Sequence, residues 1–167
     1  MSQKPPIVVA SRNPGKVREI RALLADLPVE VESLLDHPEV PAIAETGVTF
    51  TENSIQKACA VAEATGRLAL ADDSGLEVDA LDGAPGVYSA RFAGPDATDS
   101  ERNARLLELL AEIPAERRTA RYVAAITIAS PDGEVRSTVA TCEGVITDEP
   151  RGTNGFGYDP LFLVPEL

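Results

Sequence analysis

The chain has 167 residues, a hydrophobic content of 44% and a formal net charge of −12. This length and composition predict one folded domain with its own core, and no apolar run approaches the roughly 20 residues of a membrane helix. The negative charge disfavours binding to long nucleic acid, because no basic stripe exists to replace its counterions. The apolar run near the N-terminus is too short for a signal-peptide core, so we expect a cytoplasmic protein that contacts no membrane.

Histidine and cysteine are too scarce for several classes of mechanism. The chain has one histidine, His37, and two cysteines, Cys59 and Cys142, which lie far apart in the sequence. These counts exclude a Cys-His zinc cluster, and a serine or cysteine triad would depend on a histidine in a polar loop. We expect both cysteines to be buried and reduced.

In the first half of the chain, apolar patterns predict a strand and two helices. Residues 7–10 read as a buried strand, and a turn over residues 11–16 leads into a helix capped by Asn13. A second helix is expected to begin near Thr51 or Glu52 and to stop at Gly66. The predicted inward faces consist of Val17, Ile20, Leu23, Leu24 and Leu27 in the first helix, and of Ile55, Ala58, Cys59 and Ala62 in the second.

The second half of the chain predicts more strands than helices. Residues 68–71 and 76–79 read as two short strands, with Asp72 and Asp73 at the end of the first. Thr98 or Ser100 is expected to cap a third helix, whose apolar face includes Leu106, Leu107, Leu109, Leu110 and Ile113. Residues 122–129 and 135–146 then read as a β-hairpin. We therefore expect a mixed α/β domain, because a hairpin argues against a purely parallel sheet.

The turn over residues 11–16 is a candidate phosphate site. A turn that opens a helix presents free N–H groups and the positive end of the helix dipole. Only one glycine is present, so this is not a Walker A loop. An ordinary capped turn with a solvated lysine remains the alternative. The candidate residues are Ser11, Arg12, Asn13, Pro14, Gly15 and Lys16.

Two adjacent carboxylates, Asp72 and Asp73, mark a candidate metal site. Like charges at a strand end repel each other, and a divalent cation would remove that cost. Gly75 would permit a tight turn after them. Glu45 offers a further hard oxygen ligand. An acidic turn and a solvated Glu45 are the alternative interpretations.

The loop over residues 155–160 is a candidate base-binding segment. Two glycines allow its backbone to approach a ligand closely, and Phe156 or Tyr158 would stack on a flat ring. Asp159 would accept hydrogen bonds from a base. A structural turn between strands is the alternative.

Taken together, these segments resemble the inosine triphosphate pyrophosphatase family, whose members hydrolyse non-canonical purine nucleoside triphosphates. Five short motifs occur in the family's order across essentially the whole chain. The resembling segments are residues 11–16, residues 45–47 with 50–53, residues 71–76, residues 83–86 with 88–91, and residues 155–160. The resemblance implies an elongated mixed β-sheet flanked by helices, with two lobes around a central cleft, usually in a homodimer.

The resemblance also implies a reaction and roles for individual residues. The triphosphates of inosine, deoxyinosine or xanthosine would be converted to the monophosphate and pyrophosphate with Mg²⁺, which cleanses the nucleotide pool. Asp73 would be the catalytic base, and Glu45 and Asp72 would hold the metal, with Asp73 sharing that role. Substrate would contact the residues of the 11–16 turn and Ser74, together with Phe156, Gly157, Tyr158 and Asp159.

Two departures from the family pattern leave alternatives open. Ser11-Arg12 replaces the more usual threonine and small residue, although serine keeps the hydroxyl. Family members also usually continue past the last residue, Leu167, so we expect residues 1–167 to be a single pyrophosphatase domain that lacks about 30 C-terminal residues. A related pyrophosphatase for other modified nucleotides, or a nucleotide-binding module without turnover, are the competing hypotheses.

Overall fold

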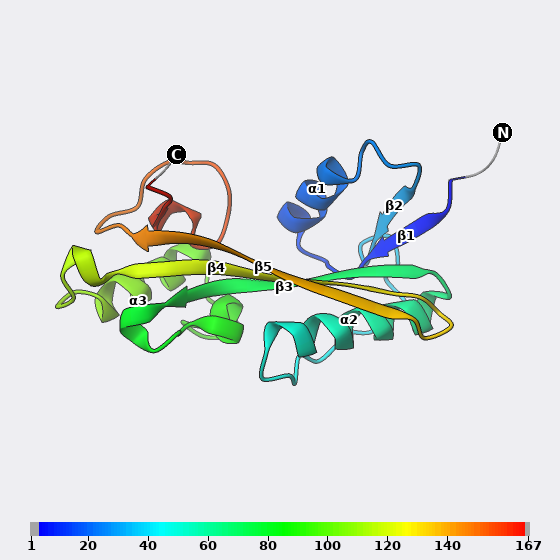
Figure 1. The fold of residues 1–167 in the computed structure, drawn as a ribbon, viewed down its shortest axis with the longest axis horizontal. Helices are drawn as coiled ribbons and strands as arrows, with labels where there is room; N and C mark the ends of the chain where they lie inside the picture. The colour runs from blue at the N-terminus through cyan, green and yellow to red at the C-terminus, as the bar shows by residue number, and fades with distance from the viewer. Residues whose placement is uncertain (1–3, 166–167) are drawn as a thin grey trace. The chain divides into compact units, whose positions relative to one another are not determined.

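The protein, seen here as a computed structural model, is described over residues 4–165 and contains a mixed six-stranded sheet with helices (Figure 1). The strand order is β2-β1-β3-β4-β5-β6. β1 runs parallel to β2 and β3, whereas β5 and β6 are antiparallel, which confirms the predicted mixed α/β fold. The strands are β1 (Pro6–Val9), β2 (Glu30–Ser33), β3 (Leu68–Val78), β4 (Thr119–Ala129), β5 (Val135–Ile146) and β6 (Phe162–Leu163). The α-helices are α1 (Pro14–Leu23), α2 (Phe50–Thr65) and α3 (Asp99–Leu109).

The chain divides into two compact units. The first unit comprises the residues up to Asp73 together with Ala125–Val139, and the second comprises Ser74–Ala124 and the residues from Ala140 onward. Each unit has its own cluster of buried apolar side chains. Among the described residues, no helix is both long enough and apolar enough to cross a membrane.

In the first unit, α1 and α2 lie on opposite sides of the strands (Figure 1). The core under α2 is built from small residues, including Ala58 and Val61 of the helix and Ala69 and Ala71 of β3. Thr49 starts α2 with a capping box, and the helix stops at Gly66, which adopts the left-handed conformation with φ 64°. The predicted end of this helix is thus confirmed, and its first residue, Phe50, lies one residue before the predicted Thr51.

The predicted apolar face of α1 is wrong at Leu23 and Leu27, whereas Val17 is buried and Ile20 and Leu24 are half-buried. Asn13 caps the helix and Pro14 opens it, as expected, but the helix ends at Leu23. Leu23 is 81% exposed, and Leu27 lies past the helix end and is 48% exposed. Only Val17 of this helix is buried, so α1 contributes one side chain rather than a stripe to the core.

The second unit contains α3, four short 3₁₀ helices and the closing strand β6. The 3₁₀ helices are η1 (Asp79–Leu81), η2 (Gly86–Arg91), η3 (Ala115–Arg117) and η4 (Asp159–Leu161). Thr98 caps α3, as predicted, and Leu106 and Leu110 are buried, whereas Leu109 is exposed. Cys142 is also exposed, against the expectation that it is buried, because it lies in a stretch of β5 whose side chains are exposed on both faces.

β4 and β5 are joined by a tight turn, which confirms the predicted hairpin. The backbone N–H of Ser130 donates to the carbonyl of Glu134, and Gly133 between them has φ 95°. A positive φ of this size suits glycine, which has no Cβ to clash with the backbone.

β3 differs most from the prediction, because residues 68–78 form one continuous strand of 11 residues. The expected break after Asp73 is absent, and Gly75 belongs to the strand rather than to a turn. Asp72 and Asp73 therefore lie in the middle of β3. Two ionised carboxylates in a partly buried strand require compensation by opposite charges, which the next section describes.

Candidate active site

Strand geometry sends the side chains of Asp72 and Asp73 to opposite faces of β3. Asp73 shares a face with Ala69 and Ala71, which pack under α2. The carboxylate of Asp72 lies instead with Lys16 of α1, at 2.7 Å between Oδ2 and Nζ. The two aspartates therefore point in different directions and have different partners.

Lys57 of α2 supplies the positive charge that compensates Asp73. Its Nζ lies 3.1 Å from Asp73 Oδ1 and 3.1 Å from Glu45 Oε1, and it donates to the backbone carbonyl of Asp72 at 2.8 Å. Lys57 is only 9% exposed. A lysine ammonium has three donors, and here three acceptors hold them, so the charge is fixed in one place.

The loop before α2 delivers Glu45 to this lysine. The backbone N–H of Thr46 donates to the side chain of Gln56 at 3.2 Å, and that of Gly47 donates to Asn53 Oδ1 at 2.8 Å. A Cβ atom on Gly47 would lie 2.7 Å from the same amide oxygen, so the close approach requires glycine. The loop is thus fastened to the helix that carries Lys57.

The Asp73 carboxyl group is more easily protonated here than the carboxyl group of an aspartate in water. Burial is the largest influence and raises the pKa, whereas the charge of Lys57 and its hydrogen bond oppose that rise. Glu45 raises the pKa further, and Asn53 lowers it from a position outside normal hydrogen-bond geometry. The pKa of Asp73 therefore lies above its ordinary value, in the direction that a general base near neutral pH requires.

Asp73 also keeps one oxygen without a hydrogen bond. Its Oδ2 is buried and has no hydrogen-bond partner among the described residues, and the same holds for Asn53 Nδ2. An unsatisfied buried oxygen is costly, and at a functional site it marks the place of a water, a cation or a ligand.

At the start of α1, the side chain of Asn13 accepts the N–H groups of Gly15 at 2.9 Å and of Lys16 at 3.3 Å. The cap thus uses two of the helix N–H groups that were predicted to bind phosphate. Arg12 donates to the backbone carbonyl of Val40 and so anchors a neighbouring loop. The hydroxyl of Ser11 and the ammonium of Lys16 also lie near the helix N-terminus, and the Lys16 ammonium is paired with Asp72 at 2.7 Å.

The predicted metal ligands come together only in part. Glu45 and Asp73 meet at Lys57, whereas the side chain of Asp72 lies with Lys16. No group of three acidic, histidine or cysteine side chains suited to a metal occurs among residues 4–165. Mg²⁺ in nucleotide enzymes is usually held by one or two carboxylates plus substrate phosphates, not by a protein cage. The carboxylates of Glu45 and Asp73 fit that mode, and Asp73 Oδ2 has no hydrogen-bond partner within residues 4–165.

In the second unit, Asp159 organises the predicted base-binding loop. Its Oδ2 accepts the backbone N–H of Phe156 at 3.0 Å, and its Oδ1 accepts the hydroxyl of Tyr122 at 3.0 Å. The ring of Phe156 is half-buried. Asp159 thus closes the loop on itself and ties it to β4, and Phe156 is the aromatic side chain it leaves partly accessible.

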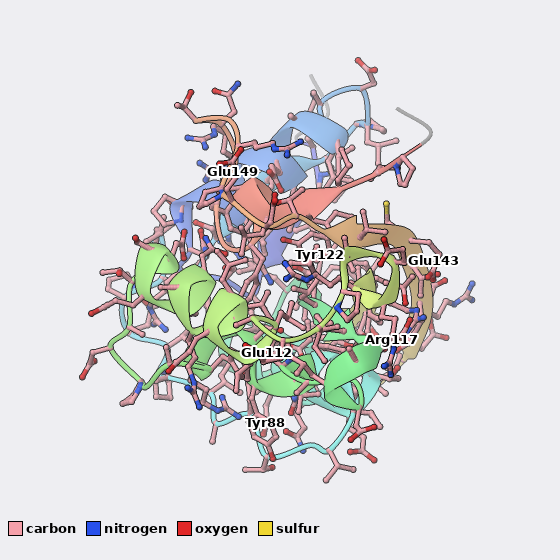
Figure 2. The ribbon with its side chains drawn as sticks, turned by 90° about the vertical axis from the view of Figure 1, so that its left-hand side faces the viewer. Tyr88, Glu112, Arg117, Tyr122, Glu143 and Glu149 are labelled. Atoms are coloured by element: carbon pink, nitrogen blue, oxygen red, sulfur yellow. The ribbon has the colours of Figure 1, made fainter. Side chains whose placement is uncertain are left out.

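Tyr158 belongs to the core of the second unit. It is 3% exposed, and its hydroxyl donates to the backbone carbonyl of Ser89 at 2.8 Å. Burial is the main reason that its pKa rises to about 12. Tyr88, next to Ser89, projects away from the ribbon and is 59% exposed (Figure 2). Of the two aromatic residues proposed for stacking, the structure gives Tyr158 a packing role.

Sequence reasoning missed Lys57 and Asn53. Both lie on the buried face of α2, in register with Phe50, Ala58 and Val61. The predicted face of this helix was rotated toward Ile55 and Cys59, which left the two polar residues on the outside. A lysine and an asparagine four residues apart inside an apolar stripe were the signal, because buried polar residues need partners.

A family model and curated relatives match nearly the whole chain. The Ham1 family model covers residues 7–167. A dITP/XTP pyrophosphatase of Exiguobacterium sibiricum is 58% identical over 161 residues, which is 96% of this chain and 81% of the relative. A dITP/XTP pyrophosphatase of Geobacter sulfurreducens is 54% identical over 160 residues, or 96% of this chain and 80% of the relative. The chain belongs to the Ham1 family.

Solved Ham1 structures share the fold. A HAM1 protein from Coxiella burnetii has a TM-score of 0.87 at 44% identity, with 97% of this chain and 83% of that chain covered. The Staphylococcus aureus Ham1 protein has a TM-score of 0.83 at 41% identity, with 96% and 82% covered. The resemblance to the inosine triphosphate pyrophosphatase family is therefore confirmed, and the charged centre on β3 lies within the Ham1 region.

Proposed function

We propose that this Ham1 protein hydrolyses the triphosphates of inosine, deoxyinosine and xanthosine to the monophosphate and pyrophosphate. The observation that carries the proposal is the state of Asp73, whose Oδ1 is held by Lys57 while its buried Oδ2 lacks a partner among the described residues. A carboxylate held in this way, with a raised pKa, suits a general base. The names of the curated relatives support the substrate class.

In the proposed reaction, Asp73 Oδ2 takes a proton from a water molecule as the water oxygen bonds to the α-phosphorus. The bond between that phosphorus and the bridging oxygen then breaks, and pyrophosphate leaves with the electron pair. Lys57 fixes the orientation of Asp73 and keeps enough positive charge nearby for the carboxylate to be ionised. The substrate is a nucleoside triphosphate alone, since the overall charge of −12 opposes polynucleotide binding.

Glu45 and Asp73 are the residues that we propose to hold Mg²⁺, with Asp72 a further acidic group on the same strand. The cation would supply electrostatic stabilisation of the charge that develops on the phosphate oxygens. Lys16 and Ser11 would hold the phosphate tail through their ammonium and hydroxyl groups. Phe156 would stack on the purine, and Asp159 would keep the loop in the shape that receives it. The family resemblance also implies a homodimer, which sedimentation equilibrium measures.

A substrate panel tests this function. Pyrophosphate release from dITP, XTP, dATP and dGTP is measured with Mg²⁺ and again with excess EDTA. We expect the highest kcat/KM for dITP and XTP, and loss of turnover in EDTA. Turnover of every triphosphate at a similar kcat/KM would contradict the proposed selectivity, and tight binding of dITP without release of pyrophosphate would contradict the hydrolase itself.

Asp73→Asn tests the proposed base. The amide keeps the size of the side chain but cannot take the proton, so we expect kcat for dITP to fall by about 10²–10⁴-fold. Circular dichroism should show an unchanged fold. Asp36→Asn, which alters an exposed carboxylate of the same unit paired with Arg21, is the matched control and should leave kcat unchanged. Wild-type turnover by Asp73→Asn would remove Asp73 from the mechanism.

A further inference from the structure

Two side chains of helix α3 bond to the backbone of Gly157 in the proposed base-binding loop. Asp99 Oδ2 accepts the backbone N–H of Gly157 at 2.8 Å, and Asn103 Nδ2 donates to the backbone carbonyl of Gly157 at 3.0 Å. Asp99 and Asn103 are four residues apart on α3, so their side chains lie one above the other on one face of the helix. Both polar groups of the Gly157 backbone are thus held by one helix.

The two hydrogen bonds from α3 matter because the backbone of Gly157 could otherwise adopt several conformations. Its φ is 61°, in the left-handed region that glycine enters easily and also leaves easily. Because α3 fixes both the N–H and the carbonyl, it selects one of the conformations open to this glycine. Phe156 immediately precedes Gly157 in the chain, so the orientation of its ring depends on the backbone conformation of Gly157.

The surroundings of Asn103 suit a hydrogen-bond donor to Gly157 better than a residue that only fills space in the core. It is only 6% exposed, and its Oδ1 is buried with no hydrogen-bond partner among the described residues. The amide cannot be turned over to relieve this, because Oδ1 would then face the carbonyl oxygen of Gly157. An apolar side chain would pack without leaving an unsatisfied acceptor, so the position favours the donor toward Gly157 over the best packing.

Asp99 is itself held in place. Arg102 pairs with its other carboxylate oxygen and also donates to the backbone carbonyl of Ala90 at 2.8 Å. Ala90 follows Ser89, whose carbonyl accepts the hydroxyl of Tyr158. Asp99, which holds Gly157, and Tyr158, which follows it, are therefore both linked to the segment around Ser89 and Ala90.

We propose that Asp99 and Asn103 are positioning residues that set affinity and selectivity for the purine base. They act through Gly157 on the orientation of Phe156. This inference rests on the proposed function, in which the loop over residues 156–159 receives the base. The chemical step on the phosphates uses other residues, so the pair should affect KM much more than kcat.

Asn103→Asp and Asp99→Asn test the proposal, with Arg105→Met as the control. Asn103→Asp keeps the shape but places an acceptor against the carbonyl of Gly157. Arg105 lies on the same helix and pairs with Glu108 at 2.6 Å. We expect Asn103→Asp to raise KM for dITP about 10-fold, equivalent to about 1.4 kcal/mol, with kcat within about twofold of wild type. Asp99→Asn should have a smaller effect in the same direction, and Arg105→Met none.

Hydrogen exchange distinguishes positioning from a general loss of stability. We expect the amides of Phe156 and Gly157 to exchange faster in Asn103→Asp, while those of β1 and α2 keep wild-type rates. Unchanged KM and unchanged loop exchange would overturn the proposal, as would faster exchange throughout the chain with kcat and KM altered together. If Asn103→Asp fails to fold, Asp99→Asn decides the outcome, because the Asp99 side chain is 45% exposed.

The same experiment separates this proposal from the proposed function. If the wild-type protein releases no pyrophosphate from dITP or XTP, the proposed function fails, and the base-affinity part of the inference fails with it. The exchange rates of the loop would still show whether Asp99 and Asn103 position Gly157. If the wild-type protein is active but the variants keep its KM, the inference fails alone.

Discussion

The two units hold their candidate functional residues in different ways. In the first unit, the two buried charged groups lie on regular elements, with Lys57 on α2 and Asp73 on β3. In the second unit, the loop over residues 156–159 is partly exposed, and hydrogen bonds to its backbone from Asn103 and to the carboxylates of Asp99 and Asp159 shape it. One centre is fixed by charge inside the core, and the other by contacts with its surroundings.

This difference indicates that the first unit carries out the chemical step and the second recognises the base. Stabilising charge in a transition state requires groups that do not reorganise, and buried ion pairs on a strand and a helix meet that need. Recognition of a base instead suits a loop whose shape is set by its neighbours. Variants of the buried charged groups in the first unit should therefore change kcat, and variants that displace the loop over residues 156–159 in the second should change KM.

Lys57→Met should have the largest effect after loss of Asp73 itself. The change removes the charge and hydrogen bond that lower the pKa of Asp73, and leaves burial and Glu45, which raise it. The base is ionised, and therefore active, only above its pKa. We expect kcat/KM for dITP at pH 7 to fall about 100-fold, and the acidic limb of its pH profile to move to higher pH.

The shift of the pH profile tests whether Lys57 lowers the pKa of Asp73. Arg21→Met, which removes an exposed cation of the same unit, is the control and should keep the wild-type profile. Denaturant unfolding monitors stability, since loss of one partner of a buried pair costs about 3–5 kcal/mol unless the carboxyl group takes up a proton. A lower kcat with an unmoved acidic limb would mean that Lys57 does not set the pKa of Asp73.

Where local rules govern the backbone, the sequence was a good guide to the fold. Asn13, Thr98 and Gly66 were read correctly as helix ends because caps and left-handed glycines act within a few residues. β3 was divided wrongly because two aspartates look like a strand end. The strand continues through Asp73 because Lys57 neutralises it, and Lys57 lies 16 residues earlier in the chain.

The pairing of charges in the site also depends on contacts between residues that are distant in the sequence. Asp73, Glu45 and Lys16 stand out in the sequence as charged residues near turns, and the structure gives each a charged partner. That Asp72 lies with Lys16, and Glu45 and Asp73 with Lys57, depends on which side of β3 each helix covers. Strand alternation alone separates Asp72 from Asp73 but does not say which partner each one meets.

Gly155→Ala should have an intermediate effect, confined to the second unit. A Cβ at this position would clash with the carboxylate of Asp159, which holds Phe156 and Tyr122. Displacing that carboxylate opens the loop, so we expect KM for dITP to rise about 10-fold with kcat nearly unchanged. Steady-state kinetics with dITP and XTP measure both parameters.

Gly152→Ala is the matched control for this loop. Gly152 has φ 77°, close to the 79° of Gly155, but a Cβ there would meet no atom within 4 Å. Both variants therefore carry the same backbone strain, and only Gly155→Ala adds the clash. Equal increases of KM in the two variants would mean that strain, rather than the position of Asp159, limits base binding.

His37→Gln should have the smallest effect, and on stability rather than on rate. His37 lies between Glu32, at 2.6 Å from Nε2, and Glu39, at 3.1 Å from Nδ1, and Arg67 also contacts Glu32. The hydrogen bond to Glu32 is the main reason that the pKa of His37 is raised. The charged imidazole thus stabilises the fold fully below the unfolded pKa of about 6.5, and this contribution is lost as pH rises through the higher folded pKa.

The wild-type Tm should therefore fall more steeply than that of His37→Gln between pH 6 and pH 9, by about 2 °C or less because the cluster is near the surface. Thermal melts followed by circular dichroism measure this, and Arg105→Met in the second unit should follow the wild-type curve. Parallel curves for wild type and His37→Gln would show that the imidazole charge does not stabilise the first unit. A change of kcat in His37→Gln at constant pH would instead mean that the charges around His37 affect the rate of the reaction as well as the stability of the first unit.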